Sequence, residues 1–445
     1  MSGNYKRTNS SLFAICHEVV EGAANYEQTS DSLGTTTTFV NSAAVGVDDE
    51  WNGYYLYAKD GANAGLARKV TGFVASSGTF TTEAFPNAMA SGVNAVLALA
   101  LPAKVSEPST DTEKLPLEFE TPTYDKPGHI VGLATCSGSF DLESSGCETP
   151  ATTSVAAVAD RQSILLQGIG AREAAISDTV QASPSPTTTT FTITDGTRLT
   201  VGRMVMVNGA VRMVSAINAN AITVKPALPA IPTDGDEVKG AETFYATEEG
   251  QRSFTMLWLR DDQLTEMRGC KINVKGTFKW GNKTMLQIEF KGTGWDKYDG
   301  YTLALPQSSK KSFAWITGAA LYDLDSVISL PVQEADFDFG ADIQEDRDSV
   351  DGNIQNVVDR NSSARLKFRT TNKVQKDNEV SGKVAEVLCQ MGGSSGGAMA
   401  FWMQGQYESV GDSDNAGIAY YDGELKHLDP NTDEASAQRM MFARW

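Results

Sequence analysis

The chain has 445 residues, about three average domains at roughly 150 residues per domain. Lys and Arg number 37 against 56 Asp and Glu, so the net charge is 37 − 56 = −19, which excludes a protein that coats nucleic acid by neutralising phosphates. Hydrophobic residues make up 41% of the chain, yet no run approaches the ~20 apolar residues of a membrane helix. We therefore expect a soluble globular protein that makes no membrane contact.

The numbers and positions of cysteine and histidine argue against disulfides, metal sites and general-base catalysis. The five cysteines are scattered and form no Cys-x-x-Cys pair, so they predict neither a disulfide framework nor a zinc site. Only three histidines are present, which leaves little material for metal binding or general-base catalysis. The first apolar patch, residues 12–15, is interrupted at once by His17 and Glu18 and is not a signal peptide. We expect no enzyme activity, no cofactor and folding in a reducing compartment.

Two stretches, residues 34–101 and 184–239, share a sequence pattern that the rest of the chain lacks. Each opens with four threonines and a phenylalanine, then alternates β-branched or aromatic residues with polar ones between turn residues. Asn208-Gly209 between two such runs predicts a two-residue hairpin. We interpret both stretches as small all-β modules inserted into a larger scaffold. Whether the two are homologous, or are only alike because both are rich in threonine, stays open.

The scaffold that remains divides into two halves with the same order of elements: hairpin, helix, hairpin. In the second half the first pair of strands encloses a long acidic loop, residues 340–361. The first half is predicted to contain strands 115–120 and 133–143 around a polar loop, helix 154–167, strand 251–259 and a hairpin with arms 270–280 and 284–291. The second half is predicted to contain strands 332–339 and 364–370, helix 378–390 and a last strand pair, 398–404 and 438–445.

Alternation along four of these strands separates an apolar face from a polar one. Successive side chains of a strand point to opposite sides of the sheet. A sheet packed on a core with water on its other side accounts for this pattern. The alternative is that the polar faces line a common water-filled channel, as strands of a closed multi-subunit barrel do. The candidate channel residues are Ser137, Ser139, Asp141, Glu143, Lys275, Thr277, Asp336, Asp338, Arg365 and Lys367.

Three segments resemble known functional motifs but lack a required part. Residues 276–284 resemble a phosphate loop, but Asn282 follows the last glycine and a strand comes next, so Gly281-Asn282 is predicted to be a hairpin turn. The Gly-x-Ser-x-Gly pattern around Ser395 leads from a helix to a strand, the reverse of a nucleophile elbow. Residues 412–417 begin like a calcium loop but lack its later ligands. Weak divalent-ion binding by the acidic stretch from Asp336 to Asp359 stays open.

Several segments together resemble the tail tube (major tail) proteins of long-tailed bacteriophages. The resemblance lies in Met267-Arg-Gly-Cys-Lys-Ile-Asn-Val-Lys-Gly after a Phe/Leu/Trp-rich strand, in Thr317-Gly-Ala-Ala-Leu opening the second half, and in Arg360-Asn-Ser-Ser-Ala-Arg before a strand and helix. It covers about two thirds of the chain, and the two inserted modules depart from it.

The resemblance implies a mainly β fold with two tube-type β-sandwich domains, each with a flanking helix, plus two small inserted all-β modules. The implied domains are residues 1–33, 102–183 and 240–300 for the first tube domain, 34–101 and 184–239 for the modules, and 301–445 for the second tube domain. Hairpins of neighbouring chains would join into a barrel ring, and stacked rings would conduct DNA. Two tube domains per chain favour a pseudo-sixfold trimer, with a hexamer of chains as the alternative.

The implied setting is the virion tail, with synthesis in the cytoplasm of the bacterial host. The implied partners are further copies of the chain, other phage tail proteins at the tube ends, and viral DNA in transient, non-specific passage. A different class remains open: a capsid decoration or host-adhesion β-protein. Carbohydrate adhesion would need an exposed aromatic cluster, for which the candidates are Trp51, Tyr54, Tyr55 and Tyr57.

Overall fold

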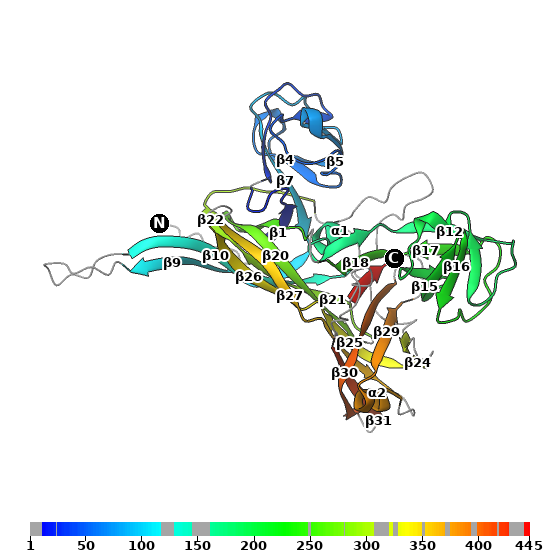
Figure 1. Ribbon diagram of the computed structural model, residues 1–445. Helices are drawn as coiled ribbons and strands as arrows, with labels where there is room; N and C mark the ends of the chain where they lie inside the picture. The colour runs from blue at the N-terminus through cyan, green and yellow to red at the C-terminus, as the bar shows by residue number, and fades with distance from the viewer. Residues whose placement is uncertain are drawn as a thin grey trace.

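The structure is a computed structural model of a mainly β protein (Figure 1). In the described part of the chain neither α-helix is long and apolar enough to cross a membrane. The described residues are 11–23, 25–116, 129–144, 161–247, 251–279, 281–306, 320–323, 328–348, 352–369, 374–392, 398–415, 418–426 and 440–445.

Two sets of five antiparallel strands share one spatial order. In the first repeat the order is β8–β10–β21–β20–β19, and in the second repeat it is β25–β28–β31–β30–β29. Corresponding strands also follow one another in the same sequence order. The first repeat consists of β8 (Ala103–Val105), β10 (His129–Glu143), β19 (Phe254–Arg260), β20 (Gln263–Lys279) and β21 (Met285–Gly292); the second consists of β25 (Val332–Asp338), β28 (Ser363–Phe368), β29 (Val384–Met391), β30 (Met399–Asn415) and β31 (Ile418–Lys426).

The two repeats join into one sheet through β20 and β25. These strands pair antiparallel from Lys275 opposite Asp338 to Lys279 opposite Glu334. At the centre of the junction Gly276 lies opposite Phe337, and a Cβ on Gly276 would lie 2.3 Å from Phe337 Cε1, so only glycine fits there. The Phe337 ring lies 5.3 Å from that of Phe278 and 5.4 Å from that of Phe401, which places the shared core of both repeats directly behind the junction.

Each repeat also carries a long hairpin arm between its first two strands. The first arm is β9 (Ser109–Pro116) paired with residues 129–137 of β10, and it extends away from the body (Figure 1). The second arm is β26 (Ala341–Asp348) paired with β27 (Gly352–Arg360). The predicted acidic loop 340–361 is therefore wrong, because its two sides pair with each other. The arm begins at Gly340, whose φ of 62° turns the chain.

The helices differ from prediction in their extent. The described part of the first is α1 (Arg161–Leu166); residues 154–160 of the predicted helix lie outside the described residues. The second, α2 (Val374–Ser381), ends before Gly382, whose φ is +62°. The rest of the predicted helix 378–390 forms β29, because Ala385, Val387 and Cys389 alternate into the core at strand spacing.

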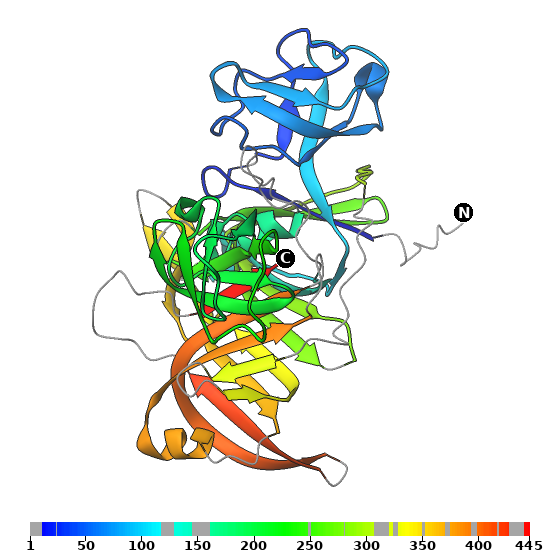
Figure 2. The ribbon, with the colours of Figure 1, turned by 90° about the vertical axis from the view of Figure 1, so that its right-hand side faces the viewer.

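The first inserted module stands apart from the body at the top of Figures 1 and 2. Its last strand, β7, also pairs with β1 (Ser11–His17) of the body and so connects the two. The module contains β2 (Glu27–Thr29), β3 (Thr38–Val40), β4 (Tyr55–Ala58), β5 (Ala67–Val74), β6 (Thr79–Thr82) and β7 (Asn94–Leu101), with 3-10 turns at Gly61–Asn63 and Ala75–Ser77.

The second inserted module is a closed six-stranded barrel. The predicted Asn208-Gly209 hairpin turn is confirmed, with φ values of 49° and 77°. The barrel begins with a strand that lies before the predicted start at residue 184, and it packs against β29 and β30 through residues such as Met206, Leu388 and Trp402. Its strands are β12 (Ile176–Gln181), β13 (Thr190–Ile193), β14 (Met204–Val207), β15 (Ala210–Asn218), β16 (Ala221–Lys225) and β17 (Glu237–Gly240), with a 3-10 turn at Gly196–Arg198.

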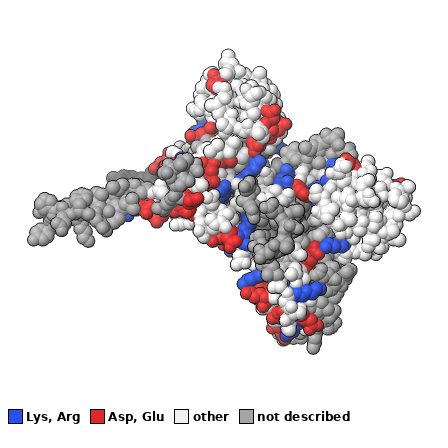
Figure 3. Space-filling model, viewed as in Figure 1, with Lys and Arg blue, Asp and Glu red and all other residues white. Residues whose placement is uncertain are grey.

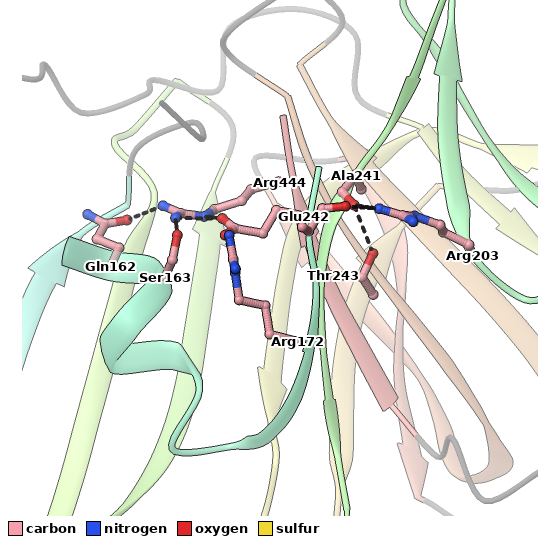
Figure 4. A network of polar contacts seen from close by, with 9 residues as sticks. Gln162, Ser163, Arg172, Arg203, Ala241, Glu242, Thr243 and Arg444 are labelled. Carbon is pink, nitrogen blue, oxygen red and sulfur yellow. Dashed lines mark hydrogen bonds and ion pairs between the residues drawn. The ribbon is translucent and has the colours of Figure 1, made fainter. Parts of the chain in front are cut away.

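A buried charge network fixes the last strand, β32 (Met440–Arg444), between β18 (Glu242–Ala246) and β30. Arg444 is 0% exposed, and its Nε and Nη2 donate to Glu242 Oε2 at 2.7 and 2.6 Å (Figure 4). Arg444 also binds Gln162 and Ser163 of α1, while Arg172 binds the other oxygen of Glu242.

The remaining strands are β11 (Gly170–Glu173), β22 (Gly294–Tyr298), β23 (Ala320–Asp323) and β24 (Ile328–Leu330).

His17 is the central residue of the joint between the body and the first module. It is 2% exposed, its ring stacks on Trp51 at 4.3 Å, and its Nδ1 accepts a hydrogen bond from the Tyr54 hydroxyl at 2.6 Å. Its Nε2 lies 2.8 Å from Glu50 Oε1, which also lies 3.0 Å from Arg252. Burial lowers the pKa of His17 although Glu50 opposes the shift, so the imidazole stays neutral in the fold.

We expect Arg444→Leu to cost about 3–5 kcal/mol of folding stability, because it leaves the buried Glu242 without its main partner. Denaturant unfolding followed by tryptophan fluorescence measures the loss. The control is Arg365→Leu, which removes an ion pair at the surface and should cost no more than about 1 kcal/mol. Equal losses in the two variants would contradict a structural role for the buried network.

We expect the joint around His17 to weaken as pH falls from 7 to 5. The unfolded chain binds a proton at His17 near the ordinary pKa of about 6.5, whereas the folded chain resists it, so this contribution to stability is complete above that pKa and is lost below it. The thermal midpoint should therefore fall over this range, and His17→Gln should reduce the dependence. An unchanged slope in His17→Gln would contradict this role of His17.

Candidate functional site

The candidate site is one continuous polar face that crosses both repeats. All ten predicted channel residues lie on it, because the registers place them in rows. Ser139 lies opposite Glu289, which lies opposite Asn273, and Asp141 lies opposite Gln287, which lies opposite Lys275. Lys275 then lies opposite Asp338, Thr277 opposite Asp336, and Asp336 opposite Arg365. The opposite face of these strands supplies the core, including Phe140, Ile272 and Leu366.

Sequence reasoning missed the members of this face that lie on β21 and β31. Gln287, Glu289 and Lys291 alternate with Leu286, Ile288 and Phe290 along β21. On β31, Asp422 and Glu424 lie opposite Lys367 and Arg365. Of the segment 412–417, compared above with a calcium loop, residues 412–415 form the end of β30, and residues 416–417 lie outside the described residues. The same period-2 alternation would have identified both sets.

Several cations on this face are paired with carboxylates, whereas Lys291 donates to a backbone carbonyl and Lys367 lies over the Tyr420 ring. Arg365 forms a bidentate pair with Asp422, with Nε–Oδ1 and Nη2–Oδ2 distances of 2.9 and 2.6 Å. Lys275 Nζ lies 2.9 Å from Glu289 and 3.3 Å from Asp338, bridging two strands. Two further ion pairs, Lys279–Glu334 at 3.6 Å and Lys283–Glu143 at 2.6 Å, lie on the same face and complete what we call the ladder of charges.

The pKa shifts on the face follow from these contacts. The hydrogen bond from Arg365 lowers the pKa of Asp422 and raises that of Arg365 itself. Hydrogen bonds and charge from Glu289 and Asp338 raise the pKa of Lys275 above its usual value, although partial burial opposes the rise. Burial raises the pKa of Asp336, so this carboxyl is more easily protonated than Asp422. The Arg365–Asp422 pair is thus charged at neutral pH.

The second arm covers part of the polar face. Lys291 Nζ donates to the Ile343 carbonyl at 2.7 Å, and the Ala341 amide donates to Asn273 Oδ1 at 3.0 Å. A cavity of about 510 Å³ lies beneath the arm, with Ser137 and Ser139 in its lining. These two candidate channel residues therefore line a hollow beside the second arm, and the other eight do not line it.

The second repeat carries an open groove at the corresponding place. The groove has a volume of about 540 Å³ and is lined by Ser363, Arg365, Ser409 and Glu424, among others. No described segment covers it in the way that the second arm covers the first repeat. In Figure 3 acidic and basic side chains are interspersed over the second repeat, at the bottom of the view, while the barrel on the right is mainly uncharged.

Of the unpaired strand edges in the described structure, two correspond to the strands of the β20–β25 junction. The first is β30 beyond Gln406, on the side that β29 occupies as far as that residue. The corresponding stretch of β20 pairs with β25. The second is the outer edge of β8, which pairs with β10 alone and corresponds to β25. The open edge of β30 thus corresponds to the junction edge of β20, and the open edge of β8 corresponds to that of β25.

The other sequence candidates provide no site. Gly281 begins the turn between β20 and β21, as predicted, with a φ of 79°. Ser395 lies outside the described residues. Among the aromatic candidates Trp51, Tyr54 and Tyr57 are buried in the core of the first module, and Arg161 lies over the Tyr55 ring at 5.0 Å. These four residues do not form the exposed cluster that carbohydrate adhesion needs.

No protein-family model matches the chain, and no relative is found among the curated proteins.

Proposed function

We propose that the chain is a tail tube subunit of a long-tailed bacteriophage, assembling into stacked rings that form the conduit for DNA ejection. The observation that carries the proposal is the repeated strand order together with the β20–β25 junction. The junction shows how one repeat adds to the next by antiparallel pairing. The same pairing between copies would join β30 of one chain to β8 of the next.

Such a contact is head-to-tail, because two different edges meet. Head-to-tail contacts give rings when the rotation closes and open filaments when it does not. Closure would pair these two edges in every chain and so remove surfaces that otherwise promote aggregation. Two repeats per chain favour three chains per ring, a pseudo-sixfold trimer, over a hexamer of chains. The repeats would then be the two tube-type β-sandwich domains, residues 1–33, 102–183 and 240–300 for the first and 301–445 for the second.

The polar face supports a conduit rather than a DNA-binding surface. Proteins grip DNA by offering lysines and arginines that replace the counterions of phosphate groups. Here Lys275, Lys279 and Arg365 are already neutralised by carboxylates of neighbouring strands. A lumen lined by paired charges, in a chain of net charge −19, would let DNA slide. The proposed location is the virion tail, with other tail proteins at the tube ends.

We expect the purified protein to form hollow striated tubes in negative-stain electron microscopy, and Val105→Pro to abolish them. The Ser106 amide donates to Ser139 of β10 at 3.2 Å, so by strand alternation the Val105 amide points to the open edge. Proline removes that donor and leaves the pairing of β8 with β10 in place.

The matched control is Val105→Thr, which keeps the amide and the β-branched shape and should still form tubes. Circular dichroism and a thermal melt show whether Val105→Pro remains folded. Wild-type protein that stays monomeric would count against the tube and favour a capsid decoration or host-adhesion protein instead. A ring reconstruction with six chains would exclude the trimer.

We expect the double variant Asp141→Lys, Glu143→Lys to assemble normally but to hold DNA. These residues lie on the uncovered part of the polar face, and the reversal releases Lys283 from Glu143. In phage the variant should slow or block DNA passage. Co-sedimentation of tubes with double-stranded DNA should show binding that weakens as salt rises. Normal infectivity with no DNA retention would contradict the lumen assignment.

A further inference from the structure

The two grooves of the polar face correspond row by row. In the first repeat Ser137 lies opposite Lys291, and Ser139 lies opposite Glu289. In the second repeat Ser363 lies opposite Lys426, and Arg365 lies opposite Glu424. In both repeats the first of these two rows therefore ends in a lysine, and the second ends in a glutamate.

The grooves differ in what covers them. The second arm lies over the first groove, where Lys291 Nζ donates to a backbone carbonyl of β26. Lys426 has the equivalent register position, opposite Ser363 at the end of the second groove, and its Nζ lies close to Glu408 and 4.0 Å from Glu424. That groove, of about 540 Å³, is polar and open.

The arms differ in the opposite sense. The second arm turns at Gly340 and lies on the preceding repeat of its own chain. The first arm has no preceding repeat in its own chain and extends from the body, with Asp111 and Lys114 of β9 exposed (Figure 1). Among the described residues, one arm thus lies on no groove of its own chain, and one groove is covered by no arm.

We infer that the groove of the second repeat binds the first arm of another copy of this chain, with Lys426 donating to a backbone carbonyl of β9. The inference rests on the proposed function, because the junction between copies places one copy's first repeat after another copy's second repeat. It adds a second contact to each seam, distinct from the pairing of β30 with β8. Backbone recognition by a lysine also tolerates the different sequences of the two arms.

The test is thiol cross-linking of assembled protein with a short bis-maleimide. Lys426→Cys is combined with Glu113→Cys in one variant and with Lys114→Cys in another. These neighbouring β9 positions point to opposite faces of the strand, so one of them faces the groove. The four described native cysteines are buried, and wild-type protein measures any background. We expect one pair to convert the monomer band into dimers and trimers on denaturing gels.

The matched control replaces Lys426→Cys with Lys291→Cys, which lies under the chain's own second arm. It should give no product between chains. Tubes that form without any product between chains in either Lys426→Cys variant would overturn the arm contact and leave the tube in place. Linked dimers in a protein that forms no tubes would retain the arm contact and overturn the tube.

Discussion

The architecture depends on one contact, the approach of β25 to β20 with the Phe337 ring directly over Gly276. Any side chain at residue 276 would displace that ring from the cluster with Phe278 and Phe401 and separate the two repeats. Because the contact holds, ten strands of two repeats share one sheet, one core and one polar face. The ladder of charges across β10, β21, β20, β25, β28 and β31 exists only because the junction keeps all six strands in register.

The ion pairs across these strands show how a face can carry many charges and still offer few of them to a ligand. Each lysine or arginine pair lies at a surface where one ion pair contributes little to stability. The pairing nevertheless matters, because a cation already held by two carboxylates, as Lys275 is, has little to offer a phosphate group. The net charge of −19 describes the whole chain, whereas the local pairing decides what the face can bind.

Strand alternation allowed the sequence to predict the faces of β10, β20, β25 and β28, and the Asn208-Gly209 turn was evident from two residues. What failed depended on tertiary pairing. Residues 341–360 read as an acidic loop because their charges dominate, yet each side supplies the other with backbone partners. Residues 384–391 have helical spacing by chance, and pairing with β30 decides in favour of a strand. The second arm lies beside Ser137 and Ser139, and His17 is buried against Tyr54 of the first module. Both contacts join segments far apart in the sequence, so no local pattern predicts them.

Linking two repeats in one polypeptide has a consequence for the kinetics of assembly. In a ring built from such chains, every second seam is closed when the chain folds, at the effective concentration of an intramolecular contact. Only the remaining seams depend on how much protein is present, so a partial ring has fewer ways to fall apart. The linkage also lets the two repeats diverge. The barrel is inserted in one and absent from the described part of the other, so an assembly of such chains would carry half as many barrels as repeats.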